Sequence, residues 1–389
     1  MAQRIRIHLF RSFIGDLHLW LGVASAIIVF LVCASGTILV FQEEFESFAS
    51  TNSTRVEARG RSPIPLDALR RSIEESTGQD VKDLIISSPG HTYVAQLVPR
   101  DAAPGSRGVP RHVDPYTGMV GAREEGESGE GFFATVERLH RWLLLDSAVG
   151  RPLVGVATLI FVVLALTGFV LWLPRRLREW QAWRRGLAIE TRKGWRRLNY
   201  DLHNTLGLYA LPLLLVMGLS GLIWSFPWYW KGMEFVLNDT LGKARFDAPI
   251  PMNYSGSREA TVPVERLLTD ADRLLPYPAM AYRVTFPQTA DHSILVRKKP
   301  AGFFRIDAAD KIQFNPYTGE ALLVERFTDQ PLRSQIASLI RSIHVGSVFG
   351  SASKLAYFAA SLIATSLPLT GVWIWLDRLL RKRKVRLRK

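Results

Sequence analysis

The stretch Asp16–Phe41, DLHLWLGVASAIIVFLVCASGTILVF, decides the fold of this chain. From Leu17 to Gln42 it contains no Asp, Glu, Lys or Arg, so it is long and apolar enough to cross a bilayer as a helix. A similar stretch recurs at Asp201–Phe226, DLHNTLGLYALPLLLVMGLSGLIWSF. An ungapped overlay of the two matches Asp16/Asp201, Leu17/Leu202, His18/His203, Leu21/Leu206, Gly22/Gly207, Ser35/Ser220, Gly36/Gly221, Ile38/Ile223 and Phe41/Phe226. Apolar character alone does not explain a shared histidine with glycines at equal offsets from it.

Four blocks of the sequence lack charged side chains, and each has about the length that spans a hydrocarbon core roughly 30 Å thick. They are Leu17–Gln42, Pro152–Pro174, Leu202–Trp230 and Leu355–Leu376. The first block follows a basic start, as a signal peptide does, but its apolar run is too long for one, and we expect an uncleaved anchor. The sequence therefore predicts an α-helical membrane protein with four transmembrane helices.

The net charge of +14 comes from three basic segments. Twenty of the 49 Lys and Arg residues lie near the N-terminus (Arg4, Arg6, Arg11), at 175–197 between the second and third spans, and in the tail after Asp377. All three segments fall on one side of the membrane if the chain crosses four times, which is the positive-inside pattern. We therefore expect both termini and the loop at 175–200 to be cytoplasmic, and no nucleic-acid partner.

The two regions that are expected to face outward have the same pattern of short elements. The first predicts a helix at Pro65–Thr77, strands at Asp83–Ser87 and Thr92–Val98, and an Asp-Pro-Tyr-Thr-Gly turn at 114–118. The second predicts a helix at Val264–Leu275, strands at Tyr282–Phe286, Ile294–Arg297 and Phe303–Ile306, and an Asn-Pro-Tyr-Thr-Gly turn at 315–319. We expect two small α+β modules, one in each half of the chain.

The whole chain is therefore expected to be two tandem copies of span, outer module and span. The expected boundaries are 1–42 (N-terminus and first span), 43–138 (first module), 139–174 (histidine segment and second span), 175–200 (basic loop), 201–230 (third span), 231–342 (second module), 343–376 (histidine segment and fourth span) and 377–389 (basic tail). Because both copies begin and end on the same side, we expect parallel repeats related by an axis along the membrane normal.

Four of the eight histidines have a counterpart in the other half of the chain. His18 and His203 lie at the start of the first and third spans, and His140 and His344 lie just before the second and fourth. A lone histidine near a membrane interface is usually an anchor or a hydrogen-bond partner of another helix. Two matched pairs favour a different role, since two neutral imidazoles are the axial ligands of a six-coordinate electron-transfer haem.

Depth in the membrane decides which histidines share an iron. A whole span, about 30 Å, separates the level of His18 from that of His140. The expected pairs are therefore His18 with His203 near the cytoplasm and His140 with His344 near the outer face. We predict two b-type haems, each held by one of these pairs.

The glycines and the single cysteine bear on the same prediction. Gly22 and Gly207 lie one turn beyond their histidines, where a missing side chain suits either a porphyrin or simple helix packing. Gly36 and Gly221 lie near the outer ends of their helices and are candidates to flank the second haem. Cys33 lies within the first span, and no CxxC or CxxCH occurs, so iron–sulfur clusters and c-type haem are excluded.

Three sets of residues together resemble the PepSY-associated transmembrane family, particularly its ferric-siderophore reductases of the ferrioxamine-reductase type from bacterial inner membranes. These are the DLHxxLG entries to the first and third spans, the D/N-PYTG turns, and the LTG…W exits of the second and fourth spans. The resemblance covers nearly the whole chain. It implies a di-haem oxidoreductase that passes electrons from the cytoplasmic side to a ferric siderophore in the periplasm, with membrane lipid as its surroundings.

The chemistry of ferric-siderophore reduction needs few catalytic groups. One-electron reduction of Fe(III) to Fe(II) weakens oxygen ligation and releases the metal, without an acid–base constellation. The sequence has no GxSxG, HExxH or Walker motif and no GxGxxG between a strand and a helix, so the expected donor is a quinol or another redox protein. The aromatic run Phe226–Trp230 is a candidate border of the outer haem, with Trp228 and Trp230 as its test positions.

Two alternative functions remain open at the level of sequence. The first is a haem-containing membrane reductase for another acceptor, such as cupric ion, a flavin or a partner protein. The second is a haem-free protein whose outer modules bind and regulate peptidases, as the PepSY family name suggests.

Overall fold

The computed structural model describes residues 2–46, 56, 60–87, 90–103, 106, 108–121, 131–174, 178–241, 248–258, 260–300 and 308–386. The chain divides into two compact units. The helical unit combines residues 1–42, 128–236 and 340–389, and the sheet unit combines residues 43–127 and 237–339. Each unit is thus assembled from segments that lie far apart in the sequence.

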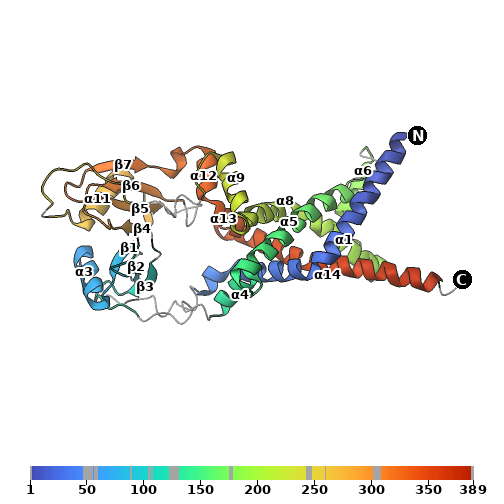
Figure 1. Ribbon diagram of the computed structural model, residues 1–389, viewed down its shortest axis with the longest axis horizontal. Helices are drawn as coiled ribbons and strands as arrows, with labels where there is room; N and C mark the ends of the chain where they lie inside the picture. Colours follow the sequence, from blue (N-terminus) through green and yellow to red (C-terminus); the bar gives the residue numbers. More distant parts are fainter. Residues whose placement is uncertain are drawn as a thin grey trace. The chain divides into compact units, whose positions relative to one another are not determined.

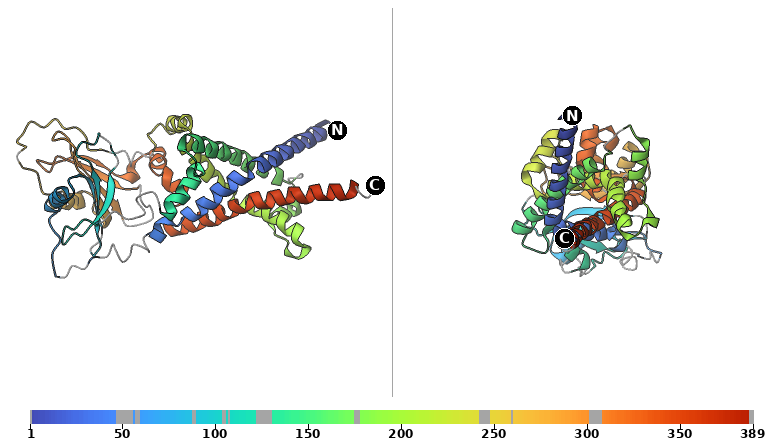
Figure 2. Two further views of the ribbon diagram at one scale, coloured as in Figure 1. Left: turned by 60° about the horizontal axis from the view of Figure 1, so that its bottom comes forward. Right: turned by 90° about the vertical axis from the view of Figure 1, so that its right-hand side faces the viewer.

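Four long helices form the body of the helical unit. They are α1 (Ala2–Leu39), α5 (Ser147–Trp172), α8 (Gly207–Ser225) and α14 (Gly350–Arg386). Each belongs to a helical stretch that is long and apolar enough to cross a membrane, which confirms the prediction of four such helices. α1 contacts α5 and α14, and α8 contacts the same two helices, so the four close a ring. The beginning of α1 and the end of α14 lie at the same end of this unit (Figure 1 and Figure 2).

The third membrane stretch is not one continuous α-helix. It runs from Trp195 to Ser225 through α7 (Trp195–Asp201), a π-helical segment η3 (Leu202–Leu206) and α8. From the sequence we expected this span to continue to Trp230. That boundary is wrong, because the helix ends at Ser225. Phe226 leaves the helix with φ −127° and ψ 118°, because the ring of Pro227 disfavours the helical region for the residue before it. Pro227 then opens a separate helix, α9 (Pro227–Leu237).

Shorter helices complete the helical unit. They are α4 (Phe132–Trp142), α6 (Trp180–Leu187), the 3-10 turn η2 (Thr191–Lys193) and α13 (Ile340–Val345). α4 ends in two consecutive left-handed residues, Leu143 (φ 56°) and Leu144 (φ 59°), a conformation that costs a non-glycine residue about 1–2 kcal/mol. Asp146 then caps α5 by accepting from the backbone N–H of Ala148 at 2.8 Å. This tight corner places α4 against the helices that follow it.

The strands of both outer segments form one sheet. They are β1 (Asp80–Ile86), β2 (Tyr93–Val98), β3 (Val109–Val113), β4 (Ala279–Thr285), β5 (Ile294–Pro300), β6 (Asp310–Phe314) and β7 (Ala321–Glu325). Their order is β3-β2-β1-β4-β5-β6-β7, with every neighbouring pair antiparallel. The sequence predicted two separate modules, but β1 pairs with β4 and joins them. The predicted strand Phe303–Ile306 lies outside the described residues.

The two helices that the sequence predicted in these segments pack on this sheet. α3 (Leu66–Thr77) contributes Leu69 and Ile73 to the buried core, and α11 (Val264–Leu274) contributes Leu267. The 3-10 turn η4 (Phe327–Asp329) and α12 (Leu332–Ser338) follow the last strand. Both predicted turns form, with Gly118 (φ 71°) and Gly319 (φ 77°) in the left-handed region that favours glycine.

α3 and α11 also satisfy each other's first turn. Glu265 of α11 accepts from the backbone N–H of Leu66, and Asp67 of α3 accepts from the backbone N–H of Val264 at 3.0 Å. The first N–H groups of a helix have no partner within it, and a carboxylate placed there also meets the positive end of the helix dipole. The two halves of the chain therefore cap each other.

Candidate functional site

The four matched histidines all lie in the helical unit and meet in two pairs. The ring centroids of His18 and His203 are 6.4 Å apart, and so are those of His140 and His344. These are the same two pairs that the argument from depth put together. His18 lies on α1 and His203 on η3, whereas the second pair lies on the short helices α4 and α13.

Each histidine of the first pair binds a threonine on a neighbouring helix through Nδ1. His18 Nδ1 is 2.9 Å from Thr167 Oγ1 on α5, and His203 Nδ1 is 2.9 Å from Thr370 Oγ1 on α14. Both hydroxyls lie 2.7–3.1 Å from carbonyl oxygens of their own helix and direct their single proton there. The hydroxyl oxygen therefore accepts from Nδ1–H, which leaves the lone pair on Nε2 of both rings.

The second pair is held by serines in the same manner. His140 Nδ1 lies 3.3 Å from Ser35 Oγ and 2.8 Å from the carbonyl oxygen of Val32 on α1. His344 Nδ1 lies 3.0 Å from Ser220 Oγ and 3.1 Å from the carbonyl oxygen of Met217 on α8. A carbonyl only accepts, so Nδ1 carries the proton here too. Burial lowers the pKa of His140 and lowers that of His344 to about 4, which keeps both rings neutral near pH 7.

A glycine next to each hydroxyl makes room for the imidazole ring. A Cβ added to Gly168 or Gly371 would lie 3.3 or 3.1 Å from Cε1 of His18 or His203. A Cβ at Gly36 would lie 2.9 Å from Cε1 of His140, and one at Gly221 would lie 3.2 Å from Cε1 of His344. Each of the four long helices thus carries the same pair of residues, which we call a notch: a hydroxyl that orients the histidine, followed by a glycine that makes room for its ring. The notches are Ser35-Gly36 on α1, Thr167-Gly168 on α5, Ser220-Gly221 on α8 and Thr370-Gly371 on α14.

The π-helical segment η3 gives His203 its own local setting. π-helical turns are rare in proteins, and those that do occur are frequently found at functional sites. The buried Asp201 just before it accepts from Arg197 Nε at 2.8 Å and from the backbone N–H of Glu190 at 3.1 Å. The buried Asn199 donates from Nδ2 to the carbonyl oxygen of Thr370 at 3.2 Å, which ties this segment to the helix that orients His203.

Both pairs fit the ligand set of a six-coordinate haem. Two metal–nitrogen bonds of about 2 Å in line, together with the two ring radii, separate imidazole centroids by about 6 Å, close to the 6.4 Å of both pairs. Ligating histidines almost always donate their other ring N–H to an acceptor, as all four do through Nδ1. Within the described ranges no three His, Cys, Asp or Glu side chains converge as a metal ligand group, so a zinc site of the usual kind is not formed there.

A comparison with protein-family models matches residues 16–378 to the PepSY-associated TM region. The chain belongs to the PepSY-associated transmembrane family. The match includes the four histidines and the four notches, and it fits the four candidate membrane helices. A comparison with curated proteins found no match. Membership of the PepSY-associated family thus establishes a membrane protein, of a class often linked to haem-based electron transfer.

A leucine side chain lies against each of Gly22 and Gly207. A Cβ at Gly22 would meet Leu164 at 3.7 Å, and one at Gly207 would meet Leu367 at 3.5 Å. These are ordinary packing distances, so contact of the two glycines with a cofactor stays a prediction. The role of the orienting hydroxyls was not predicted from the sequence, although the Thr-Gly of both LTG motifs and the Ser-Gly of α1 and α8 are repeated in it.

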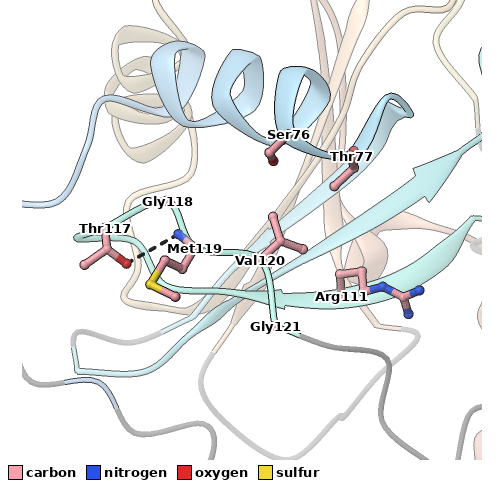
Figure 3. Close-up of a pocket in the computed structure, with 8 residues that line it drawn as sticks. All are labelled: Ser76, Thr77, Arg111, Thr117, Gly118, Met119, Val120 and Gly121. Carbon is pink, nitrogen blue, oxygen red and sulfur yellow. Dashed lines mark hydrogen bonds between the residues drawn. The ribbon is translucent and has the colours of Figure 1, made fainter.

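A pocket in the sheet unit has a different character. It has a volume of about 490 Å³ and lies between the end of α3 and the segment after β3 (Figure 3). The residues that line it are Ser76, Thr77, Arg111, Thr117, Gly118, Met119, Val120 and Gly121. None of the four matched histidines lines it, and it offers no carboxylate or thiol for a metal.

Proposed function

We propose that this protein is a one-electron reductase of the bacterial inner membrane that holds two b-type haems and reduces a ferric siderophore in the periplasm. His18 and His203 would hold one haem, and His140 and His344 the other. Haem bound in these places supplies a metal that changes between the ferric and ferrous states. The observation that carries the proposal is that the ring centroids of each pair lie 6.4 Å apart. Each of the four rings has Nδ1 bound to protein, which leaves Nε2 for a metal.

The proposal includes the orientation of the chain in the membrane. Both termini and the basic loop are assigned to the cytoplasmic side by the positive-inside pattern, and the parallel repeat follows from the sequence overlay. The pair on α1 and η3 would then face the donor, a quinol or a redox protein, and the pair on α4 and α13 would face the acceptor. Each Fe(III) chelate takes up one electron and leaves as Fe(II) and free chelator.

Visible absorption of the purified protein tests the cofactor assignment. We expect a Soret band and, after reduction, sharp α and β bands that correspond to two haems per chain. His203→Ala should remove one haem and leave the other, while His8→Ala, at an exposed position of α1, should remove neither. Loss of both haems from His203→Ala would contradict the pairing, and a colourless wild type would favour the haem-free alternative.

The acceptor is tested by re-oxidation. Protein reduced with dithionite under anaerobic conditions is mixed with ferric hydroxamate, ferric catecholate, ferric citrate, cupric ion or free flavin. We expect rapid re-oxidation by at least one ferric siderophore, with Fe(II) captured by a ferrous-specific chelator. Re-oxidation by copper or flavin alone would replace the siderophore by that acceptor.

A further inference from the structure

The two histidine pairs are built alike and still differ in the angle between their rings. Both have centroids 6.4 Å apart, both bind hydroxyls through Nδ1, and both have a glycine facing Cε1 of each ring. The ring planes of His18 and His203 nevertheless meet at 86°, whereas those of His140 and His344 meet at 50°. In the part of the chain that the structure describes, the second pair also has an aromatic contact that the first pair lacks.

Trp224 provides that contact. Its ring centroid lies 5.2 Å from that of His344, with 59° between the planes. This distance falls within the range of attractive aromatic pairs, about 4.5–7 Å. Among the described residues, no other aromatic ring contacts any of the four histidines apart from its partner histidine.

The helix α8 carries both Trp224 and the notch that holds His344. Trp224 follows Ser220 by four residues and Gly221 by three, so its side chain lies on the same face of the helix as both. Ser220 binds Nδ1 of His344, Gly221 admits Cε1, and Trp224 packs on the ring. The position that matches Trp224 in the ungapped overlay is Leu39 on α1, so the notch that holds His140 has no such ring.

We propose that Trp224 is the positioning residue that sets the plane of the His344 imidazole and thereby makes the outer haem site electronically different from the inner one. The inference rests on the proposed function. The angle between axial imidazole planes decides how equally the two iron d orbitals of π symmetry are raised in energy. Perpendicular rings raise both orbitals alike, and a smaller angle splits them. The shape of the EPR spectrum of low-spin ferric iron reports this splitting.

The test compares EPR spectra and redox titrations of wild type, Trp224→Leu, Trp224→Phe and the control Trp180→Leu. Trp180 is exposed on α6 and lies outside the aromatic run that is a candidate border of the outer haem. We expect two low-spin signals from wild type, with the larger g anisotropy at the inner site. Trp224→Leu should move only the outer signal toward the inner one and shift one of the two midpoint potentials, while Trp180→Leu should change neither.

The outcomes separate this inference from the function on which it rests. A haem-containing Trp224→Leu protein with unchanged signals and potentials would overturn the inference and leave the two-haem proposal standing. A wild type without haem would overturn both. If Trp224→Leu loses the outer haem, Trp224→Phe decides: a moved outer signal supports the inference, and an unmoved one overturns it.

Discussion

Nδ1 of His203 lies 2.9 Å from Oγ1 of Thr370, whose proton is directed at a carbonyl of its own helix. The threonine therefore acts as an acceptor and fixes the tautomer of the imidazole with Nδ1 protonated. An acceptor on the far nitrogen of a metal-bound imidazole also raises the basicity of the ligating nitrogen. One hydroxyl thus orients the ring and would strengthen it as a donor to the haem iron that we propose for this site.

Thr370→Val, which keeps the shape and removes the acceptor, should weaken the inner site. We expect about 10–100-fold lower haem affinity there and a higher midpoint potential, since a less basic ligand favours the ferrous state. Haem content and redox titration measure both effects, and Thr370→Ser should restore them in part. Thr158→Val is the matched control, because the Thr158 hydroxyl donates to the carbonyl oxygen of Val154 and binds no histidine within the part of the chain that the structure describes.

The notch glycines should differ in how strictly they exclude a methyl group. A Cβ at Gly36 would lie 2.9 Å from Cε1 of His140, closer than real contacts allow, while one at Gly168 would lie 3.3 Å from His18. Gly36→Ala should therefore abolish haem binding at the outer site, and Gly168→Ala should only weaken haem binding at the inner site. Gly232→Ala, with open space around the added Cβ, should leave both haems at the wild-type level. Equal loss from all three variants would show that helix packing, not the notch, is responsible.

The sequence could predict the histidine pairs because depth in a membrane limits which residues can meet. It could not predict the partners of Nδ1, since a Thr or Ser in an apolar helix usually binds its own backbone. Only the packing of α1 on α5, of η3 on α14, of α4 on α1 and of α13 on α8 shows that such a hydroxyl also faces a histidine. The ring angles of 86° and 50° likewise depend on contacts between helices that no periodicity encodes.

The joining of the two outer segments also depends on tertiary structure. Within the described residues, each segment has a helix and two strands close to those that its own pattern predicts. Two separate small sheets would leave β1 and β4 with an unpaired edge each, and the pairing of Asp83–Ile86 with Tyr282–Thr285 removes both edges. The partner strands lie about 200 residues apart, so local sequence carries no signal for this pairing.

The reciprocal caps of α3 and α11 should contribute to the stability of the sheet unit. Asp67→Ala removes the acceptor for the backbone N–H of Val264, and we expect a loss of about 1 kcal/mol, as for other helix caps. Thermal unfolding of the full-length protein in detergent, followed by circular dichroism, measures it. Glu75→Ala, at an exposed position of α3, is the control, and the haem spectrum should stay unchanged in both variants. An Asp67→Ala protein as stable as the control would show that water replaces the cap at no cost.

The pair of Lys298 and Asp272 should make the sheet unit sensitive to acid. The Lys298 side chain is 1% exposed, and its Nζ donates to Asp272 and to the carbonyl oxygen of Leu275 at 2.7 Å. Burial raises the pKa of Asp272, but hydrogen bonds from Lys298 and Tyr282 and the charge of Lys298 outweigh it and hold this pKa below its ordinary value.

A carboxyl whose pKa is lower in the folded than in the unfolded state contributes stability above the unfolded value, about 4, and loses it as pH falls through the folded value. Asp272→Asn should therefore lower the free energy of unfolding by about 1 kcal/mol at pH 7, where Lys298 loses its counter-charge. Below about pH 4 the difference from wild type should shrink, because the wild-type carboxyl is then protonated as well. Thermal unfolding at pH 7, 5 and 3.5 measures the difference. Asp270→Asn, which breaks the exposed pair with Arg273, should have a smaller effect throughout, and a difference for Asp272→Asn that is independent of pH would mean that shape, not charge, holds Lys298 in place.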